Sequence, residues 1–217
     1  MNHLRIDIVS DVTCPWCIIG YKALETALTE LEGELDAEIH WQPFEINPHL
    51  GPEGQSRTEN LKNKYGFTDA QVGQNQLVLD KRANRLGFEM HLDRQPTTYN
   101  TFDAHRLLHW AELKGKQSAL QQHLFHLYFT NGGNPSDHDA LIQCAEAAGL
   151  AVTEAREVLE SDQYGDEVRK DQMKYVRLGI TSVPAFIIND EYIISGGQPV
   201  ETFINDLREI AGHLSAA

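Results

Sequence analysis

The sequence has little of what nucleic-acid-binding, membrane or secreted disulfide-rich proteins need. Lys and Arg number 18 against 32 Asp and Glu, a net charge of −14, so we expect no nucleic-acid partner. No apolar run approaches the roughly 20 residues of a membrane span, and the first residues lack the apolar segment of a secretory signal. We therefore expect a cytoplasmic protein with no membrane partner.

Cysteine is also scarce. Three cysteines in 217 residues are too few for a disulfide scaffold. The chain is 41% hydrophobic and 23% charged, which is ordinary for a protein that folds around a sizeable core. Two of the three cysteines, Cys14 and Cys17, belong to one Cys-Pro-Trp-Cys motif. Their spacing is therefore more informative than their number.

The two ends of the chain combine strand and helix patterns. The predicted strands alternate apolar and polar residues or form short apolar runs between turn residues, and they cover residues 4–9, 37–45, 185–189 and 192–195. The predicted helices begin at Pro15, near residue 166 and after Pro199. The first strand, helix and second strand make a βαβ unit.

The middle of the chain is predicted to be helical throughout. Apolar residues repeat at helical spacing over residues 57–65, 69–86, 101–114, 116–130, 137–148 and 153–162. The simplest architecture is an α/β fold with one discontinuous domain, residues 1–53 and 166–217. An all-helical insertion domain would occupy residues 54–165.

The Cys-Pro-Trp-Cys motif has three readings: a zinc site, a core position or a redox-active dithiol. Zinc would need two further ligands, and Cys144, the third cysteine, stands alone in a helical segment. A strand that leads through the motif into a helix places Cys14 at a helix N-terminus, where free N–H groups and the helix dipole stabilise a thiolate. We predict that Cys14 is the exposed nucleophile. Cys17 lies one turn further and would resolve the mixed disulfide.

The two residues between the cysteines should tune this chemistry. Pro15 stiffens the turn, and Trp16 offers an apolar face beside the sulfur but no titratable cation. Stabilisation of the thiolate would then rest on backbone dipoles, opposed by the nearby Asp11.

These features together resemble the DsbA family of thioredoxin-fold oxidoreductases. The stretches SDVTCPWCIIG, YNTFDAHRLLHWA, GITSVPAFIIN and SGGQPVETF resemble its cytoplasmic FrnE-like branch. That branch is related to 2-hydroxychromene-2-carboxylate isomerases and kappa-class glutathione transferases. The resemblance covers nearly the whole chain and implies a thioredoxin-like fold with an all-helical insertion domain.

The resemblance also implies roles for residues outside the motif. Pro184 would be a cis-proline facing the cysteines, and Val183 would present backbone groups to an extended substrate. Asn47, Gly197 and Gln198, together with Val183, match positions along the peptide-thiol groove of the glutathione-dependent relatives. Turn chemistry explains Asn47 and the glycine equally well, so both interpretations stay open.

Histidines and the third cysteine are assigned no chemistry. His105 and His109, and His123 and His126, share helix faces, but no carboxylate completes a ligand motif, so we predict no metal. His105 belongs to a resembling stretch and is expected in the cleft without a catalytic role. Cys144 is expected to be buried, with a regulatory thiol as the alternative.

The predicted function is thiol–disulfide exchange with protein or glutathione substrates, as a protein disulfide oxidoreductase or isomerase. The cofactor would be the Cys14–Cys17 disulfide itself, with glutathione as a co-substrate, because no nucleotide-binding fingerprint occurs. One alternative is a glutathione-dependent isomerase or transferase acting on a small aromatic substrate. Those relatives resemble one another in having serine where Cys14 stands, which favours redox exchange. A non-enzymatic binding protein is the other alternative, and the oligomeric state stays open.

Overall fold

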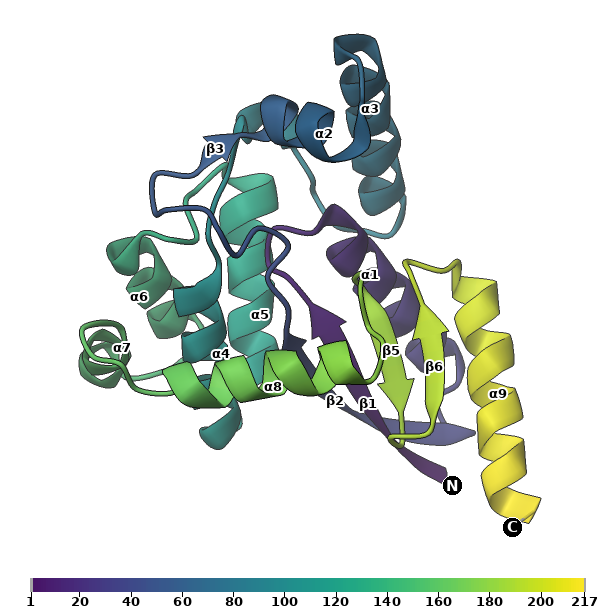
Figure 1. Ribbon diagram of the computed structural model, residues 1–217. Helices are drawn as coiled ribbons and strands as arrows, with labels where there is room; N and C mark the ends of the chain where they lie inside the picture. The colour runs from purple at the N-terminus through teal and green to yellow at the C-terminus, as the bar shows by residue number, and fades with distance from the viewer. Residues whose placement is uncertain (1, 217) are drawn as a thin grey trace.

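A four-stranded sheet lies at the centre of the computed structural model, which describes the backbone of residues 2–216 and the side chains of residues 3–214. The strand order is β2-β1-β5-β6, and helices lie on both faces of the sheet (Figure 1). The strands are β1 (Asn2–Ser10), β2 (Leu35–Pro43), β5 (Ala185–Ile188) and β6 (Tyr192–Ser195). β1 is parallel to β2, and the other neighbouring pairs are antiparallel.

The alternation of β1 divides the core between the two faces of the sheet. Leu4, Ile6 and Ile8 are fully buried against α1 (Pro15–Glu30) and α9 (Val200–Ala216). Val9 points to the other face and packs in a smaller cluster with Tyr175 of α8 (Gly165–Arg177). Figure 1 shows α8 crossing this second face. The expected α/β fold is confirmed.

The helices between β2 and α8 form two groups. The first contains α2 (Arg57–Tyr65) and α3 (Asp69–Arg85), and Figure 1 places it beyond the end of the sheet at which α1 begins. The second has its own apolar core and contains α4 (Phe102–Leu113), α5 (Gln117–Phe125), α6 (His138–Ala147) and α7 (Val152–Leu159). The expected helical insertion is therefore present, while the boundaries at residues 53 and 166 stay a prediction.

Several local features differ from the sequence prediction. The helix predicted over residues 116–130 ends as α5, and a π-helical turn follows at His126–Thr130. Two short paired strands, β3 (Gln55–Ser56) and β4 (Thr97–Thr98), and a 3₁₀ turn at Leu92–Arg94 were not predicted. Two residues are too few to show alternation. Over residues 2–216, none of the helices has the length and apolarity that crossing a membrane requires.

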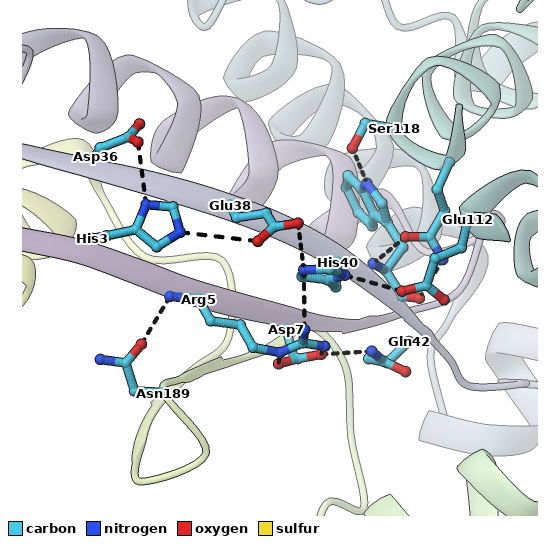
Figure 2. Close-up of polar contacts among 12 residues, drawn as sticks. His3, Arg5, Asp7, Asp36, Glu38, His40, Gln42, Glu112, Ser118 and Asn189 are labelled. Carbon is cyan, nitrogen blue, oxygen red and sulfur yellow. Dashed lines mark hydrogen bonds and ion pairs between the residues drawn. The ribbon is translucent and has the colours of Figure 1, made fainter. Parts of the chain in front are cut away.

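Polar side chains fasten the edge strand β2 to the second helical group. The Gln117 amide accepts from Trp41 N at 2.8 Å and donates to Trp41 O at 2.9 Å. These two bonds satisfy the backbone of Trp41 as a neighbouring strand would. Figure 2 shows the surrounding contacts, in which His40 Nδ1 lies 3.0 Å from a Glu112 oxygen and Trp41 Nε1 donates to Ser118 at 3.1 Å. The second helical group is thus held to the edge of the sheet.

Replacing Gln117 should test this attachment. Gln117→Leu should lower the free energy of unfolding by about 2 kcal/mol, because the buried N–H and C=O of Trp41 lose their partner. Gln122→Leu is the matched control, since the Gln122 amide nitrogen is buried without a partner. Urea denaturation would measure both variants. Equal stability of the two would contradict this account of the β2 edge.

Candidate active site

The Cys-Pro-Trp-Cys motif forms the first turn of α1. Cys14 is the N-cap residue, with extended backbone angles, and its N–H donates to Asp11 O at 3.0 Å. No side chain caps this helix, and Pro15 occupies the first turn, where its missing N–H leaves no gap. Cys14 therefore stands at the N-terminal end of α1.

The two cysteines of the motif differ in access. Cys14 is 4% exposed and lines a cleft, whereas Cys17 is fully buried. The expectation that Cys14 is exposed is therefore wrong, because the walls of the cleft bury its side chain. Burial, followed by contact with Cys14, raises the pKa of the Cys17 thiol well above its ordinary value. Neither cysteine is in a disulfide here.

The loop before β5 faces the motif from the other side. The Val183–Pro184 peptide bond is cis, and the Cys14 thiol donates to Val183 O at 3.7 Å. Pro184 is buried between this loop and α1. A Cβ on Gly20 of α1 would lie 3.3 Å from the Pro184 ring and 3.0 Å from Phe186, so only glycine lets the helix approach β5 this closely.

The cleft has a volume of about 620 Å³, within the range of small-molecule and peptide sites. Its floor contains Cys14, Trp16, Val183 and Asn47. Its opposite wall comes from α2, α3 and the link between them, and includes Leu61, Lys64, Tyr65, Phe67 and Leu79. The site is therefore apolar, with polar groups at a few positions.

Asn47 is held in place by a contact with α2, which together with α3 forms the helical roof of the cleft. Its side chain donates to Thr98 Oγ1 at 3.1 Å and accepts from Asn60 Nδ2 of α2 at 3.2 Å. Lys64, also on α2, donates to Ile46 O at 2.6 Å, and partial burial lowers the pKa of its amine. Sequence reasoning missed Asn60 and Lys64, because α2 carries too few apolar residues to show which of its faces turns inward.

Three residues expected in the cleft lie elsewhere. His105 is 4% exposed, and its Nε2 donates to Phe44 O at 3.0 Å behind the cleft. Gly197 packs against α1, where a Cβ would lie 3.1 Å from Trp16 O. Gln198 turns back to donate to Ser195 O at 2.7 Å. None of the three lines the cleft, because each is used in packing or in a turn.

A buried carboxylate stands behind the motif. Asp11 accepts from the Thr13 N–H at 2.9 Å, from the Thr13 hydroxyl at 3.0 Å and from Ile46 N at 2.6 Å. Burial raises the pKa of Asp11, and the charge of His105 is the first of the opposing effects. Asp11 thereby joins the loop after β1 to the loop after β2, which carries Asn47.

Trp16 connects the motif to α3. The Arg82 guanidinium lies 5.1 Å from the Trp16 ring centroid, a distance at which a cation and an aromatic face attract. Trp16 is half-buried and lines the cleft. The motif itself contains no titratable cation, but Arg82 of α3 supplies one beside Trp16.

Comparison with known proteins identifies relatives over the whole chain. A family model described as DSBA-like thioredoxin domain matches residues 5–208. The protein YwbO of Bacillus subtilis (strain 168) is 30% identical over 207 residues, which cover 94% of this chain and 96% of YwbO. The crystal structure of probable DsbA oxidoreductase SCO1869 from Streptomyces coelicolor has a TM-score of 0.89 and 33% identity, with 97% of this chain and 91% of that chain covered.

A more distant structure resembles the fold alone. Cytosolic disulfide reductase DsbM from Pseudomonas aeruginosa, with GSH, has a TM-score of 0.62 at 17% identity and covers 94% of this chain and 98% of its own.

The three thiols should react in a fixed order. Native protein treated with iodoacetamide at neutral pH should be modified first at Cys14, because Cys14 lines the cleft whereas Cys17 and Cys144 do not. Burial raises the pKa of Cys144 to about 11, so its thiolate is roughly a hundredfold rarer than that of an ordinary thiol. Raising the pH should therefore accelerate the modification of Cys144. Peptide mass spectrometry would give the order, and rapid labelling of Cys144 at neutral pH would contradict its burial.

Proposed function

Because the chain belongs to the family of DsbA-like thioredoxin domains, we propose that it is a thiol–disulfide oxidoreductase acting through Cys14 and Cys17. The observation that carries the proposal is the unequal placement of the two thiols. One lies at a helix N-terminus and lines the cleft, and the other is buried one turn behind it. A nucleophile and a resolving thiol need these two positions.

The cycle follows from this placement. The Cys14 thiolate attacks a substrate disulfide, so a Cys14–substrate disulfide forms and one substrate thiolate leaves. Cys17 then loses its proton and attacks Cys14, which forms the Cys14–Cys17 disulfide and releases the second substrate thiolate. In the reverse direction the same steps oxidise a substrate dithiol. The reduction potential of the pair decides the direction.

The cleft supports a substrate that is extended and narrow. Val183 presents its backbone beside the Cys14 sulfur, and the apolar wall of α2 and α3 stands opposite. An extended peptide segment that carries a cysteine fits between them, as does a small peptide thiol. The proposed working compartment is the cytoplasm. Its reducing environment would favour the direction in which the protein reduces its substrate.

Glutathione is a second candidate substrate, and the charges in the cleft favour it. Arg57 and Lys64 are cations that line the cleft of a protein with a net charge of −14, and Glu45, the anion that also lines it, is paired with Arg169. Burial lowers the pKa of both side chains, so each would gain from a carboxylate of the peptide. The structurally similar DsbM has been determined with GSH. Because Cys14 itself supplies a thiol, we favour disulfide exchange with glutathione over an isomerase or transferase reaction that uses the thiol of glutathione.

The dithiol should be required for catalysis. Wild-type protein should accelerate the reduction of insulin disulfides by dithiothreitol, and Cys14→Ser should abolish the acceleration because no nucleophile remains. Cys17→Ser should accumulate a mixed disulfide instead of turning over. Turbidity and mass spectrometry would follow the two effects. No acceleration by the wild type would remove the claim of general disulfide exchange, and acceleration that survives Cys14→Ser would contradict the role of Cys14 as the nucleophile.

The charge of Lys64 should matter for an acidic substrate. Lys64→Met should raise the KM for oxidised glutathione roughly fivefold, the effect of about 1 kcal/mol, and should leave neutral hydroxyethyl disulfide unaffected. Lys62→Met is the matched control, because Lys62 lies on the same helix but pairs with Asp69 outside the cleft. Steady-state kinetics would separate the four cases. Equal effects on the two disulfides would show that glutathione does not use this cation.

A further inference from the structure

The buried position of Cys17 raises the question of where its proton goes. Cys17 must ionise before it attacks Cys14, yet it is fully buried and does not line the cleft. The substrate would also occupy the cleft during this step. A proton that leaves Cys17 must therefore pass through groups on the interior side of the motif.

Ser10 is the side chain that meets Cys17 on that side. It is the last residue of β1 and is 2% exposed. Nearness to the Ser10 hydroxyl and to the backbone N–H of Asp11 lowers the pKa of Cys17, against the larger opposing effect of burial. The same hydroxyl has no hydrogen-bond partner of good geometry within the described part of the chain, so its bonding capacity is unused.

A small cavity begins at Ser10 and lies between β1, β2, α4 and α8. Its volume of about 10 Å³ corresponds to one water molecule. Besides Ser10 it is lined by Gln121, which is 1% exposed and whose Nε2 is a second buried polar atom without a partner. Two residues that line this cavity thus each carry a buried polar atom without a partner, which suits the cavity to one water molecule.

The cavity reaches ionisable groups near the surface. The titratable side chains that line it are His105, His109 and Glu112 of α4 and Asp171 of α8. His105 donates to Phe44 O, and Glu112 is paired with His40 in the network of Figure 2. His109 Nδ1 lies 4.0 Å from an Asp171 oxygen, and the side chains of this pair are 23% and 34% exposed. The pair therefore connects the cavity to solvent.

We propose that Ser10 and a water molecule held by Ser10 and Gln121 carry the proton of Cys17 to Asp171. This inference rests on the proposed function and assigns a route to its second step. Ser10 is a positioning residue, since it acts through Cys17. Burial raises the pKa of Asp171, with His109 opposing, which suits a carboxylate that accepts and then releases a proton.

The step balances without a further reactant. The S–H bond of Cys17 breaks and its proton passes to the Ser10 oxygen, while the hydroxyl proton of Ser10 passes to the water and a water proton passes to the Asp171 carboxylate. Ser10 and the water are unchanged at the end. The Cys17 thiolate then forms the bond to Cys14, the substrate leaves as a thiolate, and Asp171 returns the proton to solvent.

Asp11 is closer to the motif but is a poorer acceptor. Its carboxylate faces Thr13 and Ile46, from which it accepts three hydrogen bonds. Only its backbone N–H, which cannot take a proton, is directed at Cys17. The Ser10 hydroxyl, unlike the Asp11 carboxylate, therefore has no hydrogen-bond partner that a proton transfer would have to displace.

The test separates the two chemical steps in one reaction. Reduced protein mixed with 5,5′-dithiobis(2-nitrobenzoate) releases one coloured thiolate when Cys14 attacks and a second when Cys17 resolves. Ser10→Ala should leave the first release within about twofold and slow the second by at least about tenfold at neutral pH. The deficit should close as the pH rises, because hydroxide then deprotonates Cys17 without the relay. Ser10→Thr, which keeps the hydroxyl, should restore the second release.

A variant at the outer end provides an independent check. Asp171→Asn should slow the second release and shift its pH profile, whereas Asp166→Asn, on the same helix but outside the cavity, should have no effect. Removal of the unpartnered Ser10 hydroxyl should not destabilise the fold.

Each outcome has a definite reading. A second release equal to wild type in Ser10→Ala at every pH would overturn the relay and leave the dithiol function intact. If the wild type gave no Cys14-dependent first release, the proposed function would fail and the relay with it.

Discussion

The buried carboxylate of Asp11 is the constraint on which the site depends. It accepts hydrogen bonds from Thr13 and Ile46, so it joins the turn that begins α1 to the loop that follows β2. The first of these segments carries Cys14 and the second carries Asn47. A charged group buried this deeply is tolerated only when its oxygens are occupied. The same contacts that satisfy Asp11 therefore bring Cys14 and Asn47 together on the floor of the cleft.

The helical roof is held over this frame by polar contacts. Asn47 bonds to Asn60 of α2, and Arg82 of α3 stacks on Trp16. On the far side, Glu45 lines the cleft, accepts from Asn100 at 3.2 Å and pairs with Arg169 of α8. Because polar contacts hold the roof, its apolar side chains are free to face a substrate. Polar contacts also fix the position of the roof more specifically than apolar packing would.

The sequence predicts the elements of this fold better than it predicts the site. Alternation in residues 4–9 and helical spacing after Pro15 follow from chain-local sterics and burial, and the hairpin at Asn189 and Asp190, both with positive φ, follows from turn chemistry. The cleft instead depends on which face of α2 meets the motif. That choice is made by contacts such as Asn47 with Asn60, which are 13 residues apart in sequence and leave no periodic signal. His105, on α4, lies behind the cleft because its Nε2 donates to Phe44 O, a contact between residues 61 positions apart in sequence.

The division of labour between the two thiols follows from their depth. Cys14 stands at the N-terminus of α1 and borders the cleft, so a substrate can reach it. One turn further along α1, Cys17 faces the interior, where burial opposes its ionisation. In the proposed cycle, burial would keep Cys17 protonated until the mixed disulfide forms, so that it would not compete with Cys14 for the substrate. The same burial would require an interior outlet for the proton, and one water could satisfy the unpartnered polar atoms of Ser10 and Gln121.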